Sequence, residues 1–202
     1  MMPVTKKKNK GKIFIISGPS GVGKTTLFQR VIKLKKYCDK IFRSISVTSR
    51  SRRKGERDGR DYFFVSPKMF EYKIRAGHFL EWERVFDHYY GTPKKKVKDL
   101  TARGDNVLLC VDVKGAQTVR KKFKRVVSIF IKPPSMEELQ KRLNDRGSES
   151  GIVQKKRLAR VKQELNEAKY FDHIVINDQI LKAVNQLDHI LENELFIDDG
   201  RI

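Results

Sequence analysis

Cysteines, acidic side chains and long apolar runs are all scarce in this sequence, and each scarcity excludes a class of protein. The two cysteines, Cys38 and Cys110, have no spacing typical of a disulfide framework, so we expect reduced thiols and a cytoplasmic location. No run approaches the roughly 18 apolar residues of a transmembrane helix. The lysine-rich segment 1–11 lacks the apolar core of a secretory signal, and we expect it to be a disordered basic lead-in.

Acidic residues are outnumbered by basic ones, 24 against 45, which gives the chain a formal charge of +21. A charge of this size attracts nucleotides, nucleic acid and acidic membrane surfaces without choosing among them. A solvated lysine-rich surface with no specific partner would carry the same charge. We expect no specific nucleic-acid partner and no membrane partner, although the charge is compatible with non-specific binding of nucleic acid. The sequence leaves the oligomeric state open.

The segment 18–25 reads Gly-Pro-Ser-Gly-Val-Gly-Lys-Thr, which is the spacing of a phosphate-binding P-loop. It follows the apolar run 13–16 and precedes a helical pattern over 26–36. Its glycines let successive backbone N–H groups turn toward a phosphate, and the following helix directs its positive end at the same anion. A glycine-rich turn without a ligand is the alternative, which the flanking strand and helix disfavour.

Two P-loop side chains have specific predicted roles. We expect Lys24 to contact the β- and γ-phosphates of ATP and the Thr25 hydroxyl to ligate Mg²⁺. The predicted ATP-binding residues of the loop are Gly18, Pro19, Ser20, Gly21, Val22, Gly23, Lys24, Thr25 and Thr26.

Strand-like and helical segments alternate along most of the chain. Apolar segments at 107–113, 126–131 and 173–176 are each followed by a helical pattern. This alternation predicts an α/β fold, with a P-loop-type parallel sheet covered by helices on both faces. The segment 44–98 interrupts it and is predicted to be an inserted subdomain. In and beside this segment we expect strands over 41–47, 62–65 and 79–86, a helix over 67–76 capped by Ser66 and ended by Gly77, and a turn over 89–93.

Charged side chains in the inserted segment are candidates for substrate contacts. Arg50 and Arg53 are two guanidinium forks three residues apart, with Tyr62 downstream, which suits a bidentate grip on a second phosphate. Glu81 is an acceptor-only carboxylate in an otherwise apolar strand, which suits adjacent N–H donors such as those of guanine. For each, exposed solvated charge is the alternative, and neither pattern alone decides between the two.

Charged residues also stand at two places outside the inserted segment. Asp112 comes at the carboxyl end of a buried strand, where open α/β sheets bind ligands. There it would support Mg²⁺ or substrate, or else cap the next helix. Arg142, Arg146 and Arg157 flank a polar loop, and arginines on such a lid can neutralise charge on a transferring phosphoryl group. Isolated surface arginines are the alternative.

Six runs, taken in order, together resemble the guanylate kinase signature, and the resemblance covers about 12–192. The runs are 46–56, 59–65, 79–81, 90–93, 129–135 and 175–178. The resemblance implies phosphoryl transfer from ATP, bound with Mg²⁺, to GMP, giving ADP and GDP in purine nucleotide metabolism. The domain organisation that follows is a lead-in over 1–11, a single domain over 12–194 and a tail over 195–202. Within the domain, the expected parts are a core (12–43, 99–145 and 169–194), a GMP-binding subdomain (44–98) and a helical lid (146–168).

Residue roles carry over from the same resemblance. The GMP phosphate would be held by Arg50, Arg53, Tyr62 and Tyr90, and the guanine would be read by Ser46, Glu81, Thr92 and Asp112. The implied catalytic set is Lys24, Arg50, Arg142, Arg146 and Arg157, with Arg146 also on the ATP phosphates and Asn177 near the adenine. The family has Asp-x-Asp where this chain has Cys110-Val111-Asp112, which leaves Mg²⁺ to Thr25, phosphates and water.

The sequence also lacks a catalytic triad, and this absence agrees with the implied chemistry. A phosphate oxygen of GMP is itself the nucleophile, so the reaction needs no strong general base, and none of the four histidines stands in a Ser–His–Asp or Cys–His arrangement. One alternative is a peptide-binding scaffold domain of the same fold, which the intact P-loop disfavours. Another is a kinase of a different nucleoside monophosphate, which Glu81 disfavours because its carboxylate would repel the N1 lone pair of adenine.

Overall fold

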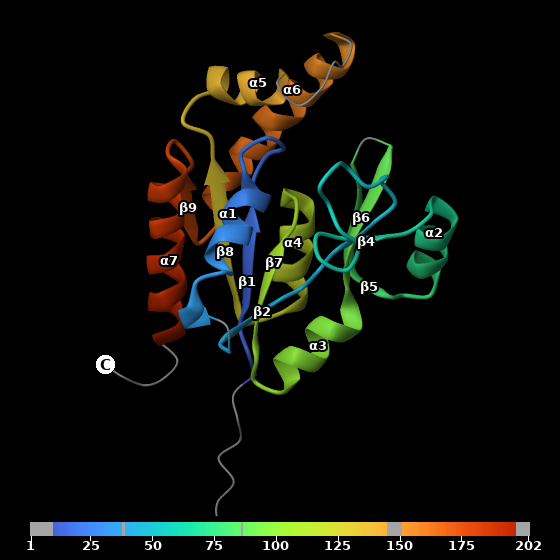
Figure 1. Ribbon diagram of the computed structural model, residues 1–202, viewed down its shortest axis with the longest axis vertical. Helices are drawn as coiled ribbons and strands as arrows, with labels where there is room; N and C mark the ends of the chain where they lie inside the picture. Colours follow the sequence, from blue (N-terminus) through green and yellow to red (C-terminus); the bar gives the residue numbers. More distant parts are fainter. Residues whose placement is uncertain (1–9, 38, 86, 145–150, 197–202) are drawn as a thin grey trace, which may run out of the picture.

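The computed structural model describes residues 10–37, 39–85, 87–144 and 151–196, without the side chains of 144, 151–158 and 196. Its centre is a five-stranded parallel sheet in the order β2-β7-β1-β8-β9 (Figure 1). The strands are β1 (Ile13–Ser17), β2 (Ile41–Arg43), β7 (Asn106–Cys110), β8 (Val126–Lys132) and β9 (His173–Ile176). The prediction of an α/β fold around a parallel sheet is therefore confirmed.

The central strand β1 is apolar on both sides, and it separates two clusters of buried side chains. Ile13 and Ile15 pack with residues of α3 and α4, whereas Phe14 and Ile16 pack with residues of α1 and α7. Because both faces are covered, the strand is fully buried. The helices are α1 (Lys24–Val31), α2 (Pro67–Arg75), α3 (Lys94–Ala102), α4 (Val113–Lys122), α5 (Met136–Asn144), α6 (Gly151–Asn166) and α7 (Ile180–Phe196), with short 3₁₀ turns at Lys35–Tyr37 and Glu167–Tyr170.

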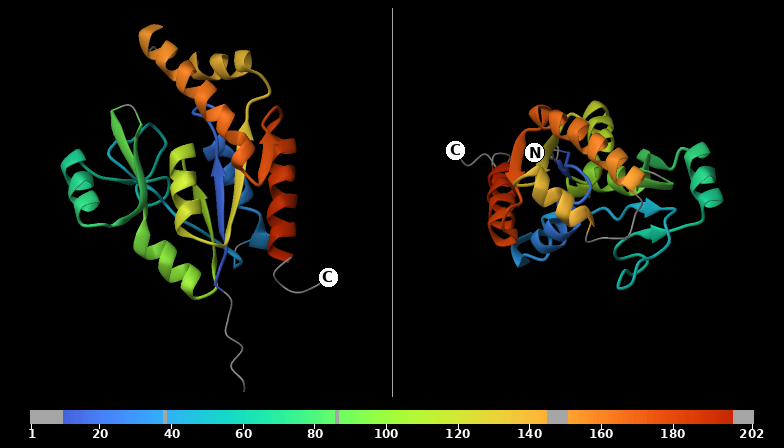
Figure 2. Two further views of the ribbon diagram at one scale, coloured as in Figure 1. Left: turned by 180° about the vertical axis from the view of Figure 1, so that it is seen from behind. Right: turned by 90° about the horizontal axis from the view of Figure 1, so that it is seen from above.

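A second sheet lies beside the first, on the side away from α7 (Figures 1 and 2). Its order is β4-β3-β6-β5, with β3 and β4 parallel and the other pairs antiparallel. Helix α2 packs on it, and the ring of Phe70 stacks between those of Phe79 and Tyr89. The strands are β3 (Val47–Thr48), β4 (Phe63–Phe64), β5 (Phe79–Val85) and β6 (His88–Pro93). The subdomain and lid boundaries given above stay predictions.

Two expectations about local structure are wrong. The run 41–47 is not one strand: Ile41–Arg43 pairs with β7 in the central sheet, and Val47–Thr48 pairs with β6 in the second. The run 89–93 is not a turn, because it lies within β6 between β3 and β5. Its glycine, Gly91, fits there because an added Cβ would lie 2.9 Å from the ring of Phe79. Pairing between distant segments overrides the local turn signal.

Helix ends follow the sequence more closely, with one displacement. Helix α1 begins at Lys24 and ends at Val31, earlier at both ends than predicted. The cap of α2 is confirmed: the Ser66 hydroxyl accepts a hydrogen bond from the Met69 N–H at 3.2 Å, and Gly77 follows with φ of +66°. Among the described residues, no helix combines the length and apolar character needed to cross a bilayer.

Candidate active site

The P-loop connects β1 to α1, and two of its glycines stand where a side chain would not fit. Gly18 has φ of +140°, and an added Cβ would lie 2.3 Å from the carbonyl oxygen of Ile131. Gly23 has φ of +90°, and an added Cβ would lie 2.5 Å from Nδ2 of Asn177. Both positions therefore require glycine for the loop to take this path.

Lys24 is the first residue of α1, and its ammonium group folds back over the loop. Nζ donates to the carbonyl oxygens of Gly18 at 2.6 Å and Pro19 at 2.9 Å. Gly23 precedes the helix as its N-cap and contributes no capping side chain, and the first turn contains no acidic residue. The positive end of the helix and the Lys24 ammonium thus act on the same space, which suits a phosphate.

A cavity of about 760 Å³ extends from the P-loop to the second sheet. The structure brings most of the predicted site residues to its wall: Gly18, Ser20, Gly21, Gly23, Lys24, Thr25, Ser46, Arg50, Arg53, Tyr62, Glu81, Tyr90 and Asp112. The predicted residues that are described but do not line it are Pro19, Val22, Thr26, Thr92, Arg142 and Asn177. Arg146 and the side chain of Arg157 lie outside the described residues.

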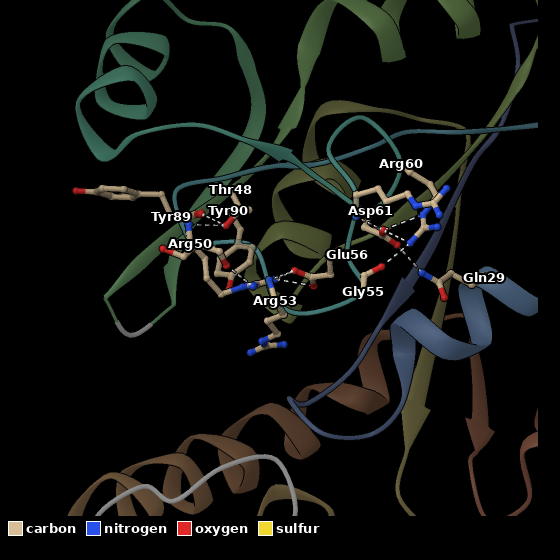
Figure 3. A network of polar contacts seen from close by, with 12 residues as sticks. Gln29, Thr48, Arg50, Arg53, Gly55, Glu56, Arg60, Asp61, Tyr89 and Tyr90 are labelled. Carbon is tan, nitrogen blue, oxygen red and sulfur yellow. Dashed lines mark hydrogen bonds and ion pairs between the residues drawn. The ribbon is translucent and has the colours of Figure 1, made fainter.

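Arg50 is a cation of this wall that several hydrogen bonds hold in place (Figure 3). Its Nη2 donates to both carboxylate oxygens of Glu56, at 2.8 and 3.1 Å, and its Nε donates to the Tyr90 hydroxyl at 3.2 Å. Burial opposes the charge, but hydrogen bonds to Glu56 and Tyr90 outweigh it and raise the pKa of Arg50. Glu56 also accepts from the Arg53 backbone N–H at 2.8 Å. Sequence reasoning did not select Glu56, although it stands three residues after Arg53.

A second carboxylate joins the same segment to the P-loop helix (Figure 3). Asp61 is buried and accepts from the Arg57 backbone N–H at 2.8 Å and from the Arg60 guanidinium at 2.7 and 2.9 Å. The Gln29 side chain of α1 donates to it at 3.0 Å. Asp61 therefore anchors the backbone immediately before Tyr62, whose ring lies edge-on to that of Tyr90 with the centroids 6.0 Å apart.

Glu81 is a buried carboxylate on β5. The Thr92 hydroxyl of the neighbouring strand β6 donates to its Oε1. Burial, together with the nearby charge of Asp112, raises the pKa of Glu81 to about 7 although Thr92 acts in the opposite direction. The residue can therefore exchange a proton near neutral pH. Thr92 does not line the cavity, and its contact with the cavity wall is its hydrogen bond to Glu81.

Asp112 caps a helix, which is one of the roles considered for it, and its predicted support of substrate stays a prediction. Its Oδ1 accepts from the Gly115 backbone N–H at 2.8 Å, so it caps α4, and its side chain also lines the cavity. Its Oδ2 accepts from Nη2 of Arg160 at 3.3 Å. Sequence reasoning missed Arg160, and the available signal was its place three residues after Arg157.

Cys110 stands at the carboxyl end of β7, beside Ile16 of β1, and lines the cavity. Burial raises the pKa of its thiol, and the charges of Lys24 and Arg43 compensate only in part. The group is a neutral thiol at physiological pH, so it does not replace a carboxylate as a ligand for a hard cation such as Mg²⁺.

Arg142 and Asn177 brace the P-loop from outside the cavity. The Asn177 side chain donates to the Val22 carbonyl oxygen at 2.7 Å. Arg142 donates from Nη1 to the Asn177 carbonyl oxygen at 3.2 Å and from Nε to Glu138 at 3.0 Å. Their predicted contacts with the nucleotide stay predictions.

A P-loop on a parallel sheet, facing arginines, tyrosines and a buried carboxylate from a second sheet, defines a P-loop kinase of nucleoside monophosphates. The guanylate kinase family model matches residues 10–194. The chain belongs to the guanylate kinase family.

Named relatives agree with that membership over nearly the whole chain. The guanylate kinase of Caldanaerobacter subterraneus subsp. tengcongensis is 44% identical over 184 residues, covering 91% of this chain and 88% of the relative. That of Carboxydothermus hydrogenoformans is 40% identical over 186 residues, covering 92% and 90%. The crystal structure of guanylate kinase from Anaplasma phagocytophilum superposes with a TM-score of 0.76 at 33% identity, covering 93% of this chain and 88% of that one.

Proposed function

We propose that this protein transfers the γ-phosphoryl group of ATP to GMP, giving ADP and GDP. The observation that carries the proposal is a single cavity of about 760 Å³ with the P-loop at one end and Arg50, Tyr90 and Glu81 at the other. A donor and an acceptor nucleotide therefore have room to meet end to end. Membership of the guanylate kinase family supports the same reaction.

The phosphate of GMP binds to the cations and hydroxyls of the second sheet in this proposal. Arg50 is already oriented by Glu56, and Arg53, Tyr62 and Tyr90 line the cavity around it. A guanidinium held in place before binding loses less conformational entropy on contact with a phosphate. Lys24 acts at the opposite end, on the phosphates of ATP.

The guanine base binds to Glu81, with Ser46 and Asp112 beside it. An ionised carboxylate accepts hydrogen bonds only, so it complements the N1–H and 2-amino donors of guanine and opposes the N1 lone pair of adenine. Thr92 holds one oxygen of Glu81, which fixes how the carboxylate is presented. Selectivity for GMP follows from the burial of this acceptor, because a mismatched base would leave it without a partner.

Phosphoryl transfer asks the protein mainly to position the reactants and to screen charge. We assign that screening to Lys24 and Arg50, and, as predicted from the sequence, to Arg142 and the lid arginines Arg146 and Arg157. The reacting oxygen belongs to GMP, so no side chain has to remove a proton from it.

The donor set fits Mg²⁺ bound with ATP. Thr25 lines the cavity next to Lys24, and the described residues hold no cluster of three His, Cys, Asp or Glu side chains. Mg²⁺ keeps several waters and takes phosphate oxygens, so one hydroxyl from the protein suffices. When bound, the ion neutralises phosphate charge. We also propose a cytoplasmic location, where the Cys110 thiol would stay reduced.

The test is ADP release from ATP and Mg²⁺ with GMP, dGMP, AMP, CMP, UMP and dTMP supplied in turn. We expect turnover with GMP, a loss of at least about 100-fold in Lys24→Ala, and a weakened preference for GMP in Glu81→Ala. Lys33→Ala is the matched control, because Lys33 is an exposed lysine next to α1. Turnover that prefers another monophosphate, or a Lys24→Ala variant as active as the control, would refute the proposal.

A further inference from the structure

Arg160 reaches the nucleotide cavity from α6 and contacts two carboxylates at once. Its Nη2 donates to Asp112 at 3.3 Å and its Nε donates to Glu164 at 2.8 Å. All three side chains are largely covered, with exposed fractions of 28% for Arg160, 20% for Asp112 and 14% for Glu164. Burial opposes the charge, but Glu164 and Asp112 outweigh it and raise the pKa of Arg160. The arginine is thus a fixed cation at the edge of the base-binding region.

Asp112 needs such a cation because a second carboxylate stands beside it. A Cβ added to Gly115 would lie 2.7 Å from Oε2 of Glu81 and 3.1 Å from Oδ1 of Asp112, so both carboxylates approach this one glycine. Two carboxylates this close disfavour each other's ionised form. The nearby charge of Asp112 contributes to the raised pKa of Glu81.

The other groups around Glu81 do not reach Asp112. Lys122 of α4 lowers the pKa of Glu81 slightly, and its Nζ donates to the Leu80 carbonyl oxygen at 2.5 Å. Glu83, further along β5, pairs with Lys114 at 3.3 Å. Among the described side chains, Arg160 is the cation that bonds to Asp112.

We propose that Arg160 is a positioning residue for guanine recognition, holding Asp112 in a fixed orientation beside Glu81. This inference rests on the proposed function. The planar guanidinium can bond to Asp112 and Glu164 from two of its nitrogens, a geometry that the single ammonium of lysine does not reproduce. Since Arg157 stands three positions earlier on α6, the same contact ties the base-reading carboxylate to the helix that carries a predicted lid arginine.

The test compares Arg160→Gln, Arg160→Lys and the control Lys162→Gln, which removes an exposed positive charge from the same helix. In Arg160→Gln we expect KM for GMP to rise roughly threefold to tenfold, with KM for ATP unchanged. The pH midpoint of kcat/KM for GMP should move up by about half a unit or more. The reason is that the charge of Asp112, no longer balanced by Arg160, would raise the pKa of Glu81 further. Arg160→Lys should keep the wild-type midpoint while losing part of the GMP affinity.

Thermal unfolding of each variant identifies a loss of GMP affinity that comes from misfolding alone. If Arg160→Gln misfolds, Arg160→Lys tests the inference, because it retains the positive charge. An unchanged KM for GMP in Arg160→Gln would overturn the inference. So would an unmoved midpoint, or a change that Lys162→Gln reproduces. A wild-type protein inactive with GMP would overturn the proposed function and the inference with it, a result distinct from an active enzyme indifferent to Arg160.

Discussion

The raised pKa of Glu81 predicts that the use of GMP rises with pH through neutrality. With a pKa of about 7, Glu81 is ionised in about one molecule in eleven at pH 6 and in about ten in eleven at pH 8. Only the ionised form offers acceptors alone to the N–H donors of guanine. We therefore expect kcat/KM for GMP to increase about tenfold between pH 6 and pH 8 from this group.

The assay must separate Glu81 from the substrate, because the phosphate of GMP also titrates, with a pKa of about 6. Glu81→Gln is the matched control: it keeps the size of the side chain and an oxygen that can accept from Thr92, but it has no proton to lose. Dividing wild-type kcat/KM by that of Glu81→Gln at each pH cancels the titration of both nucleotides. We expect the ratio to rise about tenfold with a midpoint near pH 7. A ratio that stays flat from pH 6 to pH 8 would refute the reasoning.

The same shift acts on stability, with a definite sign. The pKa of Glu81 in the folded protein, about 7, lies above the value of 4.5 for an ordinary glutamate. Between these values the native state binds more protons than the unfolded state, so the free energy of unfolding falls as pH rises. The difference amounts to about 3 kcal/mol at full ionisation. Urea unfolding at pH 5 and pH 8 should show this loss in wild type relative to Glu81→Gln.

Three further substitutions test other contacts of the site. Glu56→Gln removes the bidentate partner of Arg50 and should raise KM for GMP about tenfold without changing KM for ATP; the exposed Glu137→Gln should change neither, and equal effects of the two would contradict the role. Gly115→Ala should raise KM for GMP at least about tenfold, because the new Cβ would displace Glu81, while thermal unfolding stays near wild type; an unaffected KM would refute it. Asp61→Asn should lower the free energy of unfolding by about 1–3 kcal/mol in urea. Burial opposes the charge of Asp61, but its hydrogen bonds outweigh burial and hold its pKa below the ordinary 3.8, so that contribution should be complete above about pH 5 and shrink as pH falls; a difference between wild type and variant that does not shrink between pH 5 and pH 3 would contradict this.

Local pattern was sufficient to predict the core of the fold. The P-loop carries its signal within a few residues and forms where expected, and the apolar segment predicted over 107–113 forms a strand over Asn106–Cys110, although Val113 already belongs to α4. The segment 41–47 failed because its alternation is the same whether it serves one sheet or two. Its division depends on pairing with β7 and β6, which lie far away in the sequence. A short run does not contain that information.

The predicted site shows the same division between local and distant information. Arg50, Glu81 and Asp112 line the cavity, at positions that the family resemblance implied and that the residue pattern alone left open. The contact of Asn177 with Val22 was not predicted, and Arg160 was not foreseen. Both depend on contacts across the fold, between β9 or α6 and loops more than one element away. Arg146 and the side chain of Arg157 fall outside the described residues, so their roles stay predictions.

Three carboxylates of this region, Glu56, Asp61 and Glu164, hold arginine side chains in place. In a chain with a formal charge of +21, repulsion between cations would otherwise move guanidinium groups apart and toward solvent. Glu56 and Asp61 oppose this in the phosphate-binding segment, and Glu164 opposes it at Arg160. Glu56 fixes the guanidinium of Arg50 before a ligand arrives, so binding needs less reorganisation. Removing Glu56 should therefore weaken GMP binding even though the net positive charge increases, the opposite of what simple attraction between a cationic protein and an anionic nucleotide would give.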